Sequence, residues 1–192
     1  PKDIQVLCPT KKGVLGVENI NVEMQKVLNP PDKEKNEIRS GVNIFRTGDK
    51  IIHLVNNYQM EWYSEDGGSG SGVFNGDIGY ITYIDKSAPS MKVEFDDGRI
   101  ATYKQENFDE LTLAYAISIH KSQGSEFPAV IITASGGNPY LMTRNLLYTA
   151  ITRAKSFVVI EGTKESVAKM VKNDYTAKRN TMLAQFICGA FE

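Results

Sequence analysis

The sequence has little that would crosslink it, hold a metal ion or carry it through a membrane. Its two cysteines, Cys8 and Cys188, stand near opposite ends of 192 residues, and no C-x-x-C motif or Cys/His cluster occurs. This argues against a disulfide framework and a zinc site, and it favours a reducing cytoplasm. No run of about 18 apolar residues is present, so no membrane span is predicted. The chain starts at Pro1 without a methionine or an apolar leader, which indicates that the natural protein continues upstream.

The sequence also lacks a strong charge of either sign, with a net charge of -1 at pH 7. This balance argues against a surface coated in positive charge for non-specific nucleic-acid binding. The charge is uneven, because residues 41–111 carry six basic and twelve acidic side chains whereas residues 112–192 carry nine and five. An acidic middle beside a basic C-terminal part indicates an inserted module. With 41% apolar residues, the chain is long enough for one domain plus such a module.

The two ends of the chain have the pattern of an α/β domain. Residues 4–9 form a short apolar run that ends at a proline, and residues 17–28 have apolar side chains at helical spacing. Later apolar runs suit strands buried on both faces of a parallel sheet, and two periodic segments suit helices that cover it. The strands are expected at 111–119, 130–133 and 157–160, and the helices at 144–154 and 164–171. An amphipathic stretch at 180–187 is expected to pack on the sheet edge.

The middle of the chain has short alternating runs separated by turn residues, the pattern of a small antiparallel barrel. These runs are residues 50–55, 78–84, 91–95 and 100–103, with a hairpin turn at Asp96-Asp97-Gly98. The polar residues 32–40 and the Ser/Gly-rich residues 64–72 are expected to be loops without packed structure. The sequence thus predicts an α/β domain from residues 1–44 and 110–192, interrupted by a barrel at residues 45–109.

Two polar segments lie where apolar elements end. The first, residues 120–126, follows an apolar run, and loops at the carboxyl ends of parallel strands form the ligand crevice of an open α/β sheet. The second, residues 145–155, places Arg153 in an otherwise apolar helix. An arginine there is costly to bury without a partner, and its guanidinium fork matches phosphate oxygens. Arg153 is therefore the best single candidate for an anion contact.

These segments resemble motifs of one enzyme family. I-H-K-S-Q-G-S-E-F at 119–127 resembles motif V of superfamily-I helicases, and L-Y-T-A-I-T-R-A-K at 147–155 resembles their motif VI. Order and spacing fit the RecD/TraA branch, which includes the exodeoxyribonuclease V alpha chain. I-N-x-x-M-Q-x-x-L-N-P at 20–30 and F-N-G-D-I-G-Y-I at 74–81 are also similar to that branch. The resemblance spans nearly the whole chain. It implies the second RecA-like, P-loop-type motor domain of a DNA helicase, with an SH3-like barrel inserted into it.

The resemblance implies a nucleotide-binding role for four residues. Arg153 matches the arginine finger, which reaches across a domain cleft to the γ-phosphate as charge develops there. Gln123 matches a position near the phosphates, and Gly124 matches one where the backbone comes close to the nucleotide. Glu126 matches the carboxylate that accepts a hydrogen bond from the ribose. Plainer readings stay open: Arg153 paired with a carboxylate inside the fold, and Glu126 acting as a cap or paired with Lys121.

Three further residues match the DNA-facing side of motif V. Ser118, His120 and Lys121 are short polar groups and one cation that hold phosphates of single-stranded DNA without reading bases. The alternative for His120 is an ordinary surface histidine. Trp62 and Tyr63 in the barrel either stack on a DNA base or simply pack.

The chain also lacks a G-x-x-x-x-G-K-[ST] phosphate loop and an acidic magnesium-binding segment after an apolar strand. It therefore has one wall of an ATP site and no predicted metal ligand. We expect an upstream RecA-like domain of the same parent chain to complete the site for ATP with Mg²⁺, and the fragment alone to hydrolyse no ATP. The resemblance implies single-stranded DNA and other helicase–nuclease subunits as further partners, 5′ to 3′ travel, and a bacterial cytoplasmic location.

Alternatives remain for the barrel and for the whole chain. Either the few barrel cations cluster for weak DNA contact, which is the reading we favour, or the barrel mainly braces the motor or docks a protein. Those cations are Arg46, Lys50, Lys92, Arg99 and Lys104. A non-enzymatic adaptor is possible if the barrel has an aromatic peptide groove. That groove would draw on Tyr58, Trp62, Tyr80, Tyr83 and Tyr103. The other rivals are a superfamily-I translocase of opposite polarity and the helicase part of a conjugative relaxase.

Overall fold

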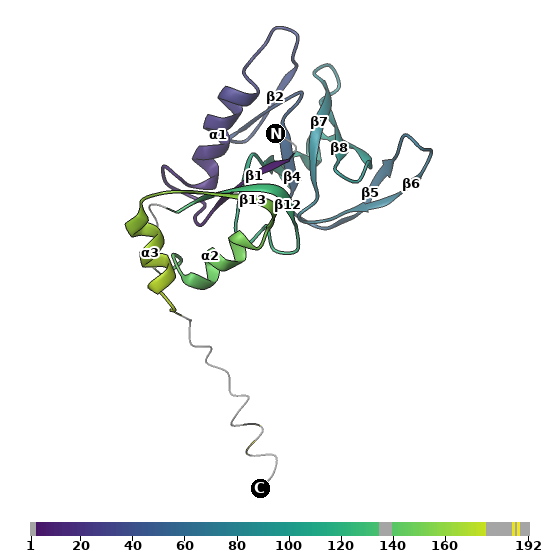
Figure 1. Cartoon of the computed structure of the whole chain (residues 1–192). Coiled ribbons are helices and arrows are strands. Elements are labelled where there is room, and N and C mark those ends of the chain that lie inside the picture. Colours follow the sequence, from purple (N-terminus) through teal and green to yellow (C-terminus); the bar gives the residue numbers. More distant parts are fainter. Residues whose placement is uncertain (1–2, 135–139, 176–185, 187, 189–192) are drawn as a thin grey trace.

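The computed structural model describes residues 3–134, 140–175, 186 and 188, and it contains one parallel sheet, one antiparallel sheet and a two-stranded hairpin (Figure 1). The amphipathic stretch predicted at 180–187 lies outside the described residues apart from residue 186. None of the helices in the described part of the chain has the length and apolar character needed to cross a membrane.

The parallel sheet has four strands, in the order β11, β1, β12 and β13. Their bounds are β1 Ile4–Cys8, β11 Ala116–Ser118, β12 Phe127–Thr133 and β13 Ala154–Glu161. The first strand of the chain thus lies between two strands that follow residue 115, so segments from both ends of the chain build one sheet. This confirms the predicted α/β fold, in which the middle of the chain is an insertion.

Helices cover both faces of this sheet (Figure 1). They are α1 Val17–Leu28, α2 Arg144–Ile151 and α3 Lys164–Lys172. α1 packs over β1 and β11, while α2 and α3 pack on the opposite face. The edge strand β13 is not buried on both faces as predicted, because α1 does not extend over it: Phe157 is 62% exposed and Val159 40% exposed.

The antiparallel sheet, which we call the barrel, has seven strands in the order β10, β4, β7, β8, β9, β5 and β6. Their bounds are β4 Lys50–His53, β5 Asn57–Tyr63, β6 Ser69–Val73, β7 Ile78–Asp85, β8 Ser90–Phe95, β9 Ile100–Lys104 and β10 Leu111–Leu113. A 3₁₀ helix, η1 Gln105–Glu110, precedes β10, and the hairpin β2 Glu37–Ser40 and β3 Asn43–Arg46 precedes β4. Alternate side chains of β8 and β9 point into one apolar core, as the alternating sequence predicts.

Three segments differ from the sequence-based expectation. The apolar run 111–119 divides between two sheets, because β10 pairs with β4 whereas β11 pairs with β1. The Ser/Gly-rich segment contains β6, which pairs with β5, and residues 37–40 form β2. A strand at a sheet edge is held by backbone hydrogen bonds, so small or polar side chains do not prevent it.

Gly79 is a point where the barrel tolerates no side chain. A methyl group on Gly79 would lie 2.5 Å from the carbonyl oxygen of Glu94 and 3.0 Å from the Cα of Phe95. We predict that Gly79→Ala destabilises the chain by roughly 1–3 kcal/mol, because strands β7 and β8 must move apart. Urea unfolding followed by Trp62 fluorescence measures this change. Lys92→Ala, at an exposed site on β8, is the control and should change stability by less than about 0.5 kcal/mol.

Candidate functional site

The loop 119–126 connects β11 to β12, and its two ends lie at opposite ends of the parallel sheet. Ser118, the last residue of β11, is level with Cys8 at the carboxyl end of β1. Phe127, the first residue of β12, is level with Ala154 at the amino end of β13. The sequence argument placed the whole loop at the carboxyl ends of the strands, but only its first residues lie there. The candidate residues therefore divide into two groups along one loop.

Hydrogen bonds inside the loop hold it in successive turns. Ser122 is buried; its backbone N–H donates to the Ser118 carbonyl oxygen at 3.2 Å, and its hydroxyl donates to that of Ile119 at 2.7 Å. Gly124 has a φ of 89°, a left-handed conformation that a residue with a Cβ adopts only at a cost. No atom lies within 4 Å of the place where its Cβ would be, so the backbone there is open to a ligand. The side chain of Gln123 is exposed beside it.

Arg153 lies just past the end of α2, not within the helix as the sequence suggested. α2 ends at Ile151, and Ala154 already belongs to β13. The Arg153 guanidinium donates from Nη1 to the Ser125 carbonyl oxygen at 3.2 Å and from Nε to the Thr149 carbonyl oxygen at 3.2 Å. Within residues 3–134 and 140–175, no carboxylate forms an ion pair with it. The half-buried cation thus lies against the loop 119–126 without a neutralising partner.

Glu126 lies near Arg153 but pairs with a different cation. Its carboxylate is 3.8 Å from the Lys155 ammonium, and both side chains are more than half exposed. The plainer sequence reading expected Lys121 as the partner. An exposed pair at this distance contributes little to stability, so it leaves Glu126 available to a ligand.

Two cations meet at the other end of the loop. Burial lowers the pKa of Lys121, and the positive charge of Lys11 lowers it further. Lys11 follows β1 and Lys121 follows β11, which is the neighbouring strand, so the fold brings the two loops together. The side chain of His120 is exposed beside Lys121, and Ser118 accepts the Lys121 backbone N–H at 3.3 Å. Sequence reasoning found Ser118, His120 and Lys121 but missed Lys11.

The barrel lies close to this cationic end through His53. The His53 side chain is fully buried, and the Tyr103 hydroxyl contacts its Nδ1 at 3.0 Å. Its Nε2 lies 3.6 Å from the Glu110 carboxylate. Burial is the main cause that lowers the pKa of His53, and the positive charge of Lys121 adds to this effect. The lowered pKa favours the neutral form of His53, which is packed against Tyr103 in the barrel.

Three of the five barrel cations considered from the sequence are bound within the protein. Arg46 pairs with Glu37, Lys50 is buried, and Arg99 donates to Asp77 and Asp97 at 2.7 Å each. Only Lys92 and Lys104 of the five are exposed. This distribution weighs against the cationic DNA-binding face that we favoured from the sequence, and it supports the bracing alternative.

A cleft of about 360 Å³ lies between barrel residues 76–78 and 95–99 and loop residues 125–128. Asp77, Asp96, Asp97 and Glu126 line it together with Arg99. The excess of carboxylates disfavours a phosphate inside this cleft. Among the described residues, no group of three His, Cys, Asp or Glu side chains is arranged to hold a metal ion.

Comparisons with known proteins match both units. Residues 20–95 match the family model described as the SH3 domain of ATP-dependent RecD-like DNA helicases. Residues 113–160 match that of the UvrD-like helicase C-terminal domain. The chain is related to the RecD-like superfamily-I helicases. The ATP-dependent RecD2 DNA helicase of Deinococcus radiodurans is 31% identical over 81% of the chain and 19% of its own length. The RecBCD enzyme subunit RecD of Buchnera aphidicola is 27% identical over 88% of the chain and 26% of its own length.

A solved structure agrees with the RecD-like assignment at the level of the fold. Pif1 helicase from Bacteroides, in complex with ADP-AlF3 and single-stranded DNA, superposes with a TM-score of 0.56. It is 19% identical, and the match covers 99% of this chain and 45% of that protein. The chain thus spans about a fifth to a quarter of the RecD-like relatives and under half of the Pif1 helicase. Its fold is a RecA-like domain with an inserted SH3-like barrel.

Proposed function

We propose that the chain is the C-terminal part of the motor of an ATP-dependent DNA helicase or translocase. In this proposal its motif V and motif VI segments form one wall of the ATP site and part of the grip on single-stranded DNA. The contact between the Arg153 guanidinium and the loop 119–126 carries the proposal, because it joins the two segments around one cation that has no carboxylate partner in the described part of the chain.

The residues around Arg153 suit a nucleotide that a second domain also holds. Arg153 and the open backbone at Gly124 are donors for phosphate oxygens. Gln123 directly precedes Gly124 in the loop, and Glu126 is an acceptor for a ribose hydroxyl. ATP with Mg²⁺ supplies the γ-phosphoryl group, and the upstream RecA-like domain supplies the phosphate loop and the metal ligands. Arg153 then stabilises the negative charge that develops during transfer, provided that the two domains close.

The other end of the loop suits a nucleic-acid backbone. Two cations, Lys11 and Lys121, lie at the carboxyl ends of β1 and β11 together with the polar side chains of His120 and Ser118. Such a set holds phosphates without reading bases, so binding should be insensitive to sequence and should weaken with salt. Because the loop 119–126 carries both nucleotide-facing and DNA-facing residues, closure of the two motor domains on ATP can move the DNA contacts. This is the population shift by which such a motor advances.

The proposal is tested by comparing the chain with its full-length parent. Alone, the chain should release no phosphate from ATP above the buffer rate, with or without single-stranded DNA. The full-length parent should hydrolyse ATP, and single-stranded DNA should stimulate it. Steady-state phosphate release measures both. DNA-stimulated hydrolysis by the chain alone, lost in Arg153→Ala, would contradict the one-wall proposal, and an inactive parent would contradict the motor assignment.

A further inference from the structure

One side of α1 carries buried amides where an apolar stripe was expected. Asn21, Gln25 and Asn29 follow one another at four-residue spacing, so they lie on one side, and they are 4%, 5% and 4% exposed. The apolar Val27 and Leu28, which the sequence pattern placed on the buried side, are 78% and 46% exposed. A buried amide is costly unless its hydrogen bonds are satisfied, so the segments packed against α1 must supply partners.

The first amide binds the chain where it leaves the barrel. This outgoing crossing, residues 113–116, connects β10 to β11. Asn21 donates to the carbonyl oxygens of Leu113 at 3.0 Å and Ala116 at 2.9 Å, and its own oxygen accepts the Ala116 N–H at 2.8 Å. From β1, Gln5 donates to the carbonyl oxygens of residues 114 and 115 at 3.1 Å each. Both α1 and the parallel sheet therefore hold the outgoing crossing.

The other two amides bind the chain where it enters the barrel. Gln25 donates to the Ile44 carbonyl oxygen at 2.7 Å, and Asn29 donates to that of Thr47 at 3.2 Å. Both also donate to the carboxylate of Asp49, at 2.6 Å and 2.7 Å. This incoming crossing, residues 44–49, lies directly before β4, so α1 fixes the position at which the first strand of the barrel begins.

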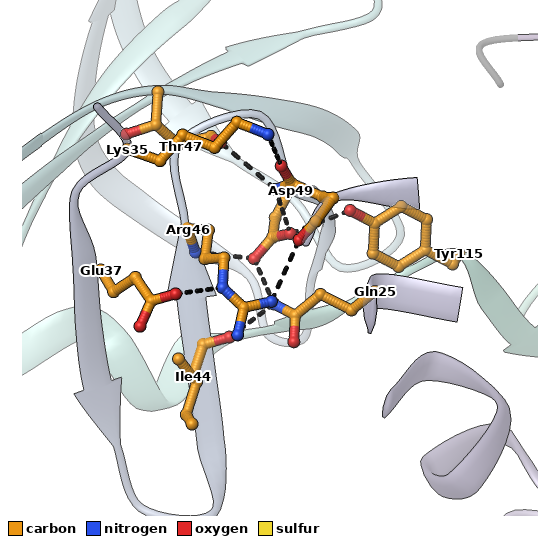
Figure 2. Close-up of polar contacts among 9 residues, drawn as sticks. Gln25, Lys35, Glu37, Ile44, Arg46, Thr47, Asp49 and Tyr115 are labelled. Carbon is orange, nitrogen blue, oxygen red and sulfur yellow. Dashed lines mark hydrogen bonds and ion pairs between the residues drawn. The ribbon is translucent and has the colours of Figure 1, made fainter. Parts of the chain in front are cut away.

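Asp49 connects the two crossings (Figure 2). Its carboxylate is fully buried and also accepts the Arg46 N–H at 2.7 Å and the Tyr115 hydroxyl at 2.8 Å. Tyr115 belongs to the outgoing crossing, so one side chain joins α1, the incoming crossing and the outgoing crossing. Burial raises the pKa of Asp49, whereas its four donors favour the charged form. The carboxylate has no spare acceptor position, so loss of one oxygen leaves buried donors unpaired.

Apolar packing joins the same two units. Ile52 of β4 and Ile78 of β7 lie in one core cluster with Ile117 of β11 and with the helix α2. The barrel and the parallel sheet thus share a continuous interior. Its hydrogen bonds fix the orientation of one unit relative to the other, and its apolar side chains exclude water.

We infer that Asn21, Gln25, Asn29, Asp49 and Tyr115, which we call the polar clamp, lock the barrel and the parallel sheet into one rigid body. Asp49 is a positioning residue in this clamp. It acts through Tyr115 and Ala116 on β11, and β11 leads directly into the loop 119–126. The barrel therefore cannot swing separately from that loop. The consequence for DNA-dependent hydrolysis rests on the proposed function, but the rigidity does not.

The rigidity is tested by spin-label distances in the 192-residue chain. With Cys188 replaced by Ser, Lys86→Cys in the barrel and Lys164→Cys at the start of α3 place labels on exposed sites of the two units. We expect one narrow distance distribution in the labelled chain with Asp49 intact and a broadened one in Asp49→Asn. This substitution keeps the shape of the side chain but turns one acceptor into a donor. Hydrogen exchange at the Ala116 amide should speed up by roughly tenfold or more.

Asp85→Asn is the matched control, because Asp85 is a barrel carboxylate that accepts the Ser87 and Ala88 N–H groups of its own exposed turn. It should leave both measurements unchanged. If Asp49→Asn does not fold, Tyr115→Phe removes a single donor and should broaden the distances to a smaller extent. If the folded clamp variants have distance distributions as narrow as that of the labelled chain with an intact clamp, the inference is overturned.

The full-length parent separates positioning from general destabilisation. In Asp49→Asn we expect a severalfold loss of stimulation by single-stranded DNA, while the ATP concentration for half-maximal rate stays unchanged. A matching rise in that concentration would show that the ATP wall itself is damaged, which contradicts action through the loop. An inactive parent leaves the spin-label result valid, so failure of the proposed function and failure of the clamp can be told apart.

Discussion

Replacing Arg153 with alanine in the full-length parent should reduce the rate of ATP hydrolysis about 10³-fold or more, the effect expected when an arginine finger is lost. ATP affinity should change only a few-fold, because the guanidinium contributes most when charge builds up on the transferred phosphoryl group. Stability should change little, since the side chain is partly exposed and, among the described residues, bonds to two backbone carbonyls and the Thr152 hydroxyl. Steady-state kinetics and nucleotide-binding titrations measure the two effects separately.

Arg144→Ala is the matched control for this experiment. Arg144 is the first residue of α2, at the opposite end of the helix from Arg153; its side chain is exposed, and it should be dispensable for hydrolysis. Equal losses in both variants would point to a general effect of charge on α2. A loss of ATP binding as large as the loss of rate would mean that Arg153 holds the ground state and is not a finger.

Replacing Lys11 and Lys121 together with alanine should weaken single-stranded DNA binding by roughly 10- to 100-fold at moderate salt. Each cation that contacts a phosphate contributes about 0.7 to the slope of log affinity against log salt, so the slope should fall by roughly 1.4. Fluorescence anisotropy with a labelled oligonucleotide at several salt concentrations measures both. A loss of affinity that does not depend on salt would show that these lysines are not phosphate contacts.

A double variant in the barrel is the matched control for the Lys11/Lys121 experiment. Lys92 and Lys104 are its two exposed cations among the five considered, and Lys92→Ala/Lys104→Ala removes the same charge. Because Arg46, Lys50 and Arg99 are held inside the protein, the barrel should contribute little, and this variant should retain affinity within about threefold. If it loses as much affinity as the Lys11/Lys121 variant, the barrel is part of the DNA grip and not only a brace.

The adaptor alternative loses support from the positions of the aromatic residues. Tyr103 is buried in the barrel core, and the ring of Trp62 packs so closely on Gly70 that an added methyl group would lie 2.7 Å from it. Tyr58 is exposed but pairs edge-on with Phe74 at 5.7 Å. An open groove of about 940 Å³ runs along β5 and β6, yet Trp62 is the only one of the five predicted aromatics that lines it. The aromatic set thus does not form one peptide-binding surface.

Periodicity predicted the parts of the fold that follow from apolar spacing. The helix at 17–28 has the bounds expected from the sequence, and the parallel strands formed where runs of β-branched residues occur. Adjacency of the loop 119–126 and Arg153 followed from the two motifs. The break at residues 114–115 could not be predicted, because a continuous apolar run does not show which of two cores each residue enters.

Buried polar residues were the main gap in the sequence-based prediction. Asp49, Lys50 and His53 lie in or next to one strand and are 0%, 2% and 0% exposed, although a binary pattern assigns such residues to the surface. Their burial depends on donors and acceptors 20 to more than 60 positions away, such as Asn29 and Tyr115. The signal was present in the amides at residues 21, 25 and 29, whose regular spacing marks a second, polar face of the helix.

The strand pair β4–β10 means that the SH3-like unit cannot be cut out cleanly at the positions where its sequence pattern starts and stops. A deletion of residues 45–109 would leave Leu111 and Leu113 without the strand they pair with. It would also strip the amides of α1 of their acceptors in the removed segment. The remainder would expose apolar surface and unpaired polar groups at once, so a truncated version is expected to aggregate. Grafts between relatives should therefore be joined inside the parallel sheet, not at the edges of the insertion.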